Sequence, residues 1–112
     1  MIKGRFLDKM LLLSEACIEF SKYSLDNNLV NAQKYIHDII GNLNKGMNTF
    51  LDWNLVLNQV GGPNHVGNFC DAPFMFHTEE KILMERELQP YIWHFSHFLE
   101  EGYTRIGFSR YT

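Results

Sequence analysis

Runs of apolar residues along the chain predict three strands. Residues 9–13 form an apolar run that meets polar Ser14-Glu15. Residues 50–57 form a second run, and residues 72–77 a third and shorter one. Continuous apolarity over a few residues is typical of parallel strands that are covered on both faces. The sequence therefore favours a sheet with parallel strands.

Two other stretches have the periodicity of amphipathic helices. Within residues 29–43, apolar side chains recur at helical spacing: Leu29, Ala32, Ile36, Ile39, Ile40 and Leu43. This helix is expected to end near Gly41 or Gly46, and residues 88–99 predict a second helix.

The remaining segments are more polar or richer in turn residues. Residues 61–67 hold three glycines and a proline and predict a loop. The charged stretch 79–87 predicts a solvated helix or loop, and residues 103–111 a strand-like tail. The resulting order, strand, helix, strand, loop, helix, is typical of the βαβ unit of α/β proteins. It is too short for a closed barrel of eight strands and eight helices.

Composition narrows the classes of function. The 112 residues carry a net charge of −3, which gives no basic footprint for nucleic acid. The 46% apolar and 21% charged residues are typical of a globular domain. No run of about 18 apolar residues predicts a membrane span, and the N-terminus lacks the features of a signal peptide. Two cysteines, Cys17 and Cys70, do not make a disulfide framework and are expected to be free thiols.

The stretch 49–71 places an indole and several amides at a strand end and in the loop that follows. It runs through Asp52-Trp53-Asn54, a Gly-Gly-Pro-Asn turn and Asn68-Phe69. An aromatic platform with polar groups suits a sugar pocket, because a ring covers a sugar face while its N–H donates to a hydroxyl. This stretch resembles the C-terminal part of the glucosylceramidases, glycoside hydrolase family thirty. Upstream, Leu13-Ser14-Glu15-Ala16-Cys17 resembles the nucleophile strand of that family, in the same order and at similar spacing.

The resemblance implies a fold and a division of the chain. Residues 1–102 would be the C-terminal portion of a (β/α)8 TIM barrel, about strands seven and eight with their helices. Residues 103–112 would begin a β-sandwich domain, because Thr104 to Ser109 resembles the entry into it. His94-Phe95-Ser96-His97-Phe98 resembles a packing helix of the family.

The same resemblance assigns the site residues. Glu15 would be the nucleophile, and Trp53 and Asn68 would bind the sugar. Asp52 and Asn54 would support the strand end, and Cys17 would line the pocket. Glu15, Trp53 and Asn68 each have a plainer alternative: a helix-start or surface glutamate, a core or rim tryptophan, and a turn asparagine.

A retaining glycosidase needs a second carboxyl about 5–5.5 Å from the nucleophile. The only other acid upstream of Glu15 is Asp8, and the downstream glutamates are expected on the surface: Glu79, Glu80, Glu85, Glu87, Glu100 and Glu101. Without this acid/base, the isolated chain is expected to be inactive.

The histidines lack a metal-binding motif, and no metal or cofactor is expected.

Two hypotheses of function remain. The chain belongs to a β-glucosidase that cleaves glucosylceramide, or another β-glucoside, with retention of configuration. Alternatively, it is an inactive fragment or a non-catalytic module that binds glycans or proteins. The remainder of the barrel, or another copy of the chain, is a potential partner. The resemblance implies a lysosomal or secreted parent protein.

Overall fold

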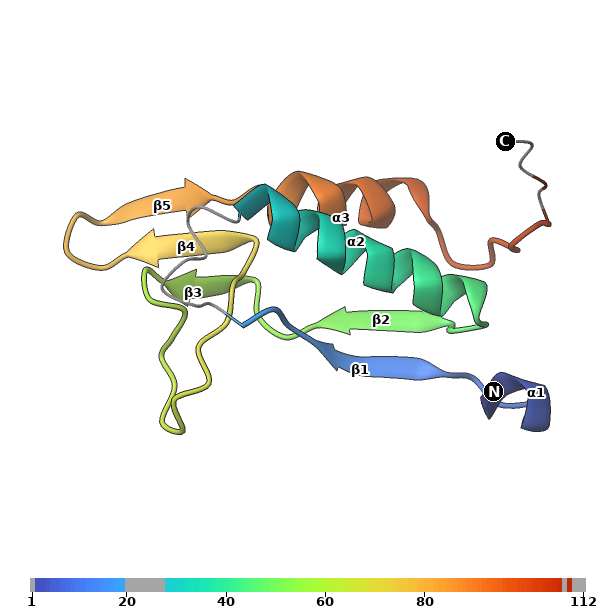
Figure 1. Cartoon of the computed structure of the whole chain (residues 1–112). Helices are drawn as coiled ribbons and strands as arrows, with labels where there is room; N and C mark the ends of the chain where they lie inside the picture. The colour runs from blue at the N-terminus through green and yellow to red at the C-terminus, as the bar shows by residue number, and fades with distance from the viewer. Residues whose placement is uncertain (1, 20–27, 108, 110–112) are drawn as a thin grey trace.

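The computed structural model is a mixed α/β structure with two small sheets and two long helices, and residues 2–19, 28–107 and 109 are described (Figure 1). The elements follow in the order α1 (Ile2–Arg5), β1 (Leu12–Ala16), α2 (Asn28–Asn44), β2 (Thr49–Asp52), β3 (Val56–Asn58), β4 (Phe74–His77), β5 (Ile82–Glu85) and α3 (Leu88–Phe98). Within the described residues the strands form no closed barrel.

Strands β1 and β2 pair in parallel, and α2 forms the crossover between them. Helices α2 and α3 lie side by side over one face of this sheet (Figure 1). Their apolar stripes meet the strands in a core built on five buried residues: Ala16, Ala32, Tyr35, Ile39 and Leu88. The predicted βαβ unit is therefore confirmed, with both helices within one residue of the expected bounds.

The expected strand 50–57 is wrong as a single element. It divides into β2 and β3, which belong to different sheets. The break falls after Asp52, whose carboxylate accepts the backbone N–H of Trp53 at 2.8 Å. The same N–H also donates to the carbonyl of Ala16 at 3.0 Å, so the carboxylate of Asp52 shares it with the strand pair at the end of β2.

The second sheet has the order β3-β4-β5, with β3 and β4 parallel and β4 and β5 antiparallel. The expectation of a solvated helix or loop over 79–87 is wrong, because Ile82–Glu85 is a strand. A turn at Lys81, with φ of 55°, folds this strand back onto β4. The apolar core of β5 is only three residues long and is flanked by charges, so its pairing with β4 decides its structure.

The ends of the remaining segments follow simple backbone rules. Gly46, with φ of 92°, lies just beyond α2 and allows the chain to leave the helix, as expected from the sequence.

The described part of the tail, 103–107 and 109, forms no strand, contrary to expectation, and 108, 110 and 111 lie outside the described residues. No helix among the described residues is long and apolar enough to cross a membrane.

Candidate functional site

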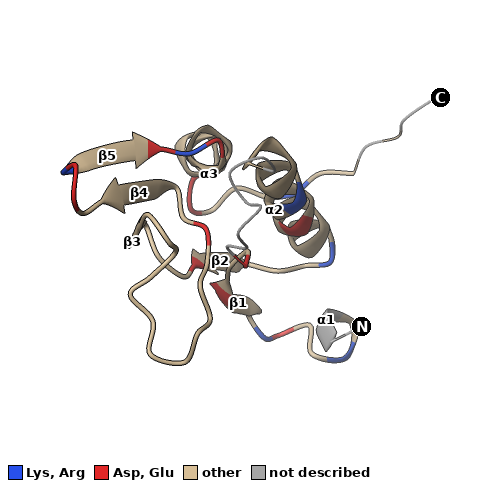
Figure 2. Cartoon of the chain, turned by 60° about the vertical axis from the view of Figure 1, so that its left-hand side comes forward, with Lys and Arg blue, Asp and Glu red and all other residues tan. Residues whose placement is uncertain are grey.

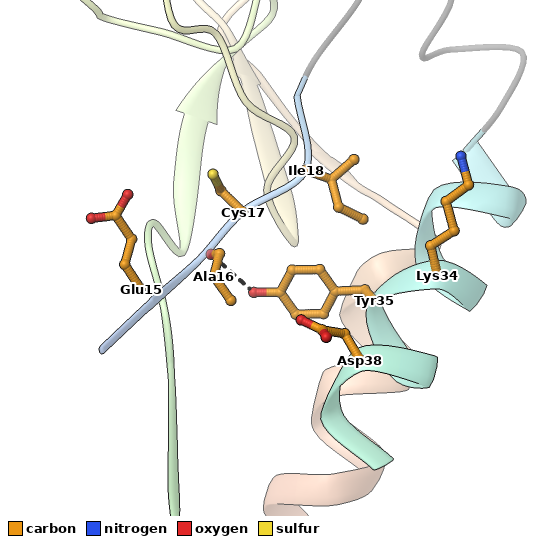
Figure 3. A pocket seen from close by; sticks show the side chains of 7 residues that line it. All are labelled: Glu15, Ala16, Cys17, Ile18, Lys34, Tyr35 and Asp38. Carbon is orange, nitrogen blue, oxygen red and sulfur yellow. Dashed lines mark hydrogen bonds between the residues drawn. The ribbon is translucent and has the colours of Figure 1, made fainter. Parts of the chain in front are cut away.

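Glu15 lies one residue before the end of β1, on an irregularity of the sheet. Leu13 pairs with Phe50 and Ala16 with Asp52, so β1 carries one more residue than β2 between these pairs. The extra residue lets Leu13 and Ala16 both pack toward α2. Such bulges re-aim neighbouring side chains and are frequent beside active sites. The carboxylate of Glu15 is thereby exposed on the face of β1 turned away from Tyr35 (Figure 3).

Trp53 lies directly beside this strand end. Its backbone N–H donates to the carbonyl oxygen of Ala16 at 3.0 Å, and its side chain is 37% exposed. The two adjacent parallel strands therefore deliver Glu15 and Trp53 at the same edge of the sheet. Figure 2 shows acidic positions on β1 and at the end of β2, where Glu15 and Asp52 lie.

A buried tyrosine holds the two strand ends against α2. The hydroxyl of Tyr35 is within hydrogen-bonding distance of the carbonyl of Ala16, at 3.2 Å, and of the Asp52 carboxylate. The Tyr35 ring also packs edge-on against Phe50, with centroids 5.5 Å apart. Because Asp52 bonds both Tyr35 and the N–H of Trp53, it fixes the backbone that carries the indole.

Burial changes the acidity of this pair. The pKa of Asp52 is raised by desolvation, and the hydrogen bonds from Tyr35 and from the N–H of Trp53 oppose this only in part. The pKa of Tyr35 is raised strongly, first by burial and then by its hydrogen bond to Asp52. Tyr35 therefore stays protonated and acts as a structural hydrogen-bonding group rather than as an acid.

Asn68 lies in the loop between β3 and β4, whose shape depends on another asparagine. The side-chain oxygen of Asn64 accepts the N–H groups of Val66 and Asn68, at 2.8 and 3.1 Å, and its amide donates to the Asn68 carbonyl at 2.7 Å. These bonds use the backbone of Asn68 and leave its exposed side chain pointing outward from a fixed turn. A Cβ on Gly62 would lie 3.2 Å from the backbone nitrogen of Asn64, a close approach that favours glycine there.

The end of this loop is anchored to the chain beyond Glu15. The N–H of Asp71 donates to the carbonyl of Ile18 at 2.7 Å, and Cys70 forms an isolated antiparallel bridge with Glu19. The carboxylate of Asp71 is buried in a two-point ion pair with Arg86, with both N–O distances 3.1 Å. The loop that carries Asn68 thus docks onto the segment that follows the candidate nucleophile.

A hollow of about 520 Å³ lies between the end of β1 and α2 (Figure 3). Its lining includes Glu15 and Cys17 together with Lys34 and Asp38 of α2, but neither Trp53 nor Asn68. Cys17 is exposed, and Asn54 is half-buried after the end of β2.

Several residues that shape the site were not expected from the sequence. Tyr35, Asp71 and Arg86 make contacts between distant parts of the chain, which no local pattern signals, whereas Asn64 was expected to shape its loop and does so. The downstream glutamates are all exposed, as expected: Glu79, Glu80, Glu85, Glu87, Glu100 and Glu101. On α3, His97 stacks on Trp93 with centroids 4.6 Å apart, and His94 packs against Phe98 at 4.8 Å.

A carboxylate and an indole at the carboxyl ends of neighbouring parallel strands, with helices on one face, are the arrangement of α/β-barrel enzymes. The chain belongs to glycosyl hydrolase family 30, because residues 2–99 match the glycosyl hydrolase family 30 TIM-barrel domain. It is similar to the lysosomal acid glucosylceramidase of Mus musculus, at 35% identity over 105 residues, 91% of this chain and 20% of the relative.

Solved structures agree with this assignment. SrfJ from Salmonella typhimurium superposes with a TM-score of 0.82 at 36% identity, over 90% of this chain and 22% of that protein. An endo-β1,6-glucanase gives a TM-score of 0.76 at 25% identity, over 99% of this chain and 25% of that protein. The chain spans about a fifth of the length of the curated relatives it matches.

Proposed function

We propose that this chain supplies the nucleophile half of a retaining β-glucosidase that hydrolyses glucosylceramide to glucose and ceramide. The observation that carries the proposal is the position of Glu15. It is exposed on a bulge at the end of a parallel strand, beside Trp53, in a chain of glycosyl hydrolase family 30. Similarity to a lysosomal acid glucosylceramidase supports the choice of substrate.

In this mechanism the carboxylate of Glu15 attacks the anomeric carbon and forms a glycosyl-enzyme. A second carboxyl, contributed by another part of the barrel, protonates the leaving oxygen and then activates the water that releases the sugar. Trp53 would cover one face of the glucose, and Asn68 would bond a hydroxyl from its fixed turn. Asp52, Asn54 and Cys17 would support this edge of the pocket.

The proposal places the chain within a larger barrel. Residues 1–102 would contribute strands seven and eight with their helices, and residues 103–112 would lead into a β-sandwich. The parent protein would act in a lysosome or outside the cell. The isolated polypeptide would turn over little or no substrate, because loss of acid/base catalysis alone costs about 10²–10⁴-fold in rate.

A chimeric enzyme tests the role of Glu15. Residues 1–102 would replace the matching segment of a glucosylceramidase, and hydrolysis of a β-glucoside would be followed with its product anomer. Glu15→Gln is expected to lower kcat by at least about 10⁴-fold, because residues that act as one catalytic unit cannot substitute for each other. The matched control is Glu19→Gln, an exposed carboxylate on the same segment, which is expected to keep most of the activity. Equal loss in both variants, or an inverted product, would refute the proposal.

A further inference from the structure

Cys17 and Cys70 come from distant parts of the chain and meet beside the candidate nucleophile. Cys70 forms an antiparallel bridge with Glu19, and the N–H of Asp71 bonds the carbonyl of Ile18 at 2.7 Å. Residues opposite each other in such a pair share a face, and so do residues two apart on one strand. Extended to this isolated bridge, the rule places Cys17 diagonal to Cys70 on the same face.

The two thiols differ in their environment. Cys17 is exposed, whereas Cys70 is only 2% exposed. The pKa of Cys70 is raised to about 12, first by burial and then by the neighbouring Cys17 and the nearby carboxylates of Glu15 and Glu19. An exposed thiol is open to an oxidant from solvent, while the buried thiol beside it is shielded from direct attack.

We propose that Cys17 and Cys70 form a reversible dithiol–disulfide site that is oxidised by small disulfides of the glutathione class. The Cys17 thiolate attacks one sulfur of the small disulfide, forms a mixed disulfide and expels one thiolate. Cys70 then loses its proton to solvent and attacks the Cys17 sulfur, which expels the second thiolate. Two protein thiols are oxidised, and one small disulfide is reduced to two thiols.

Closing this bond would draw two parts of the site together. Diagonal neighbours in a regular strand pair lie about 7–8 Å apart, and a disulfide accepts Cα separations up to about 6.8 Å. At that ideal spacing, closure needs a local shift of roughly 1 Å rather than a change of fold. It would tie the segment after Glu15 to the loop that carries Asn68, which already docks there through Asp71.

The 112-residue chain tests this site directly. It would be equilibrated with mixtures of reduced and oxidised glutathione, quenched with acid and weighed intact. The expected product is a monomer lighter by two hydrogen atoms, with a peptide map that joins Cys17 to Cys70 at every protein dilution. In the matched Cys70→Ser variant, only a glutathione adduct on Cys17 is expected.

Repeating the titration in guanidinium chloride distinguishes a disulfide promoted by the fold from one formed by chance contact of the two cysteines in the unfolded chain. The fold holds the two thiols together, so the ratio of closed disulfide to dithiol should be at least tenfold higher in native buffer. Independent glutathione adducts on both cysteines, disulfide-linked dimers, or equal ratios in both solvents would overturn the proposal. None of these readouts involves a glycoside, so their outcome is independent of the role proposed for Glu15.

Discussion

At the scale of single residues, the site depends on contacts between distant positions. The sequence motif around Glu15 could be recognised, but the bulge that aims it could not, because an extra residue exists only relative to the paired strand β2. The hydrogen bonds of Tyr35 could not be predicted from the sequence either, because helical periodicity shows only that Tyr35 belongs to α2. Contacts between distant segments, rather than local sequence pattern, set the geometry of the strand ends.

Removing the hydroxyl of Tyr35 should weaken the fold. In Tyr35→Phe the buried ring remains, but Asp52 and the carbonyl of Ala16 lose a partner. We expect a loss of about 1–3 kcal/mol in the free energy of unfolding, measured by urea denaturation. The control is Tyr103→Phe, whose ring is 64% exposed and should leave stability unchanged. Equal stability of both variants would show that the Tyr35 hydroxyl does not hold the strand ends.

The raised pKa of Asp52 predicts how stability depends on pH. Because its pKa is higher in the folded than in the unfolded chain, the folded state binds the proton more tightly. The contribution of Asp52 is therefore largest below its ordinary pKa of 3.8 and is lost as pH rises through the raised folded value. The free energy of unfolding of the unmodified chain, relative to that of the Asp52→Asn variant, should fall as pH rises over this range. Urea denaturation at several pH values measures it. A relative stability that rises with pH would show that the sign is wrong.

At the scale of elements, prediction succeeded where periodicity was long. Helices α2 and α3 have apolar stripes of several turns, and their bounds followed from the sequence. Strands β3 and β5 are three and four residues long, and pairing with β4 determines them. The loop between β3 and β4 is shaped by the hydrogen bonds of Asn64 within it and is anchored by the ion pair of Asp71 with Arg86.

Breaking this ion pair should destabilise the loop that carries Asn68. Arg86→Met leaves the carboxylate of Asp71, whose side chain is 1% exposed, buried without its partner. We expect a loss of about 3–5 kcal/mol in stability, with faster amide hydrogen exchange at Cys70 and Asp71. Adding Asp71→Asn should recover part of the loss, because no buried charge then remains unpaired. Exchange at these amides equal to that in Arg105→Met, a change at an exposed arginine, would contradict this role.

At the scale of the whole molecule, the described residues cover the sheet of β1 and β2 on one face only. Helices α2 and α3 cover that face, while Leu12 and Leu51, 53% and 48% exposed, belong to strands whose other face is open (Figure 1). Placing this face toward the interior of a larger barrel, as proposed, would bury these leucines and enclose Glu15 and Trp53. Under the proposed function, this βαβ unit of a family 30 protein would carry one carboxylate of a two-carboxylate mechanism.

The most direct test is to trap the intermediate on Glu15. The protein that carries this sequence would be purified from its native source, treated with a mechanism-based β-glucoside inactivator and mapped by mass spectrometry. The account predicts one sugar adduct, on the peptide that contains Glu15, in a polypeptide larger than 13.2 kDa. An adduct on another carboxylate, or no adduct on a protein that hydrolyses the substrate, would contradict it.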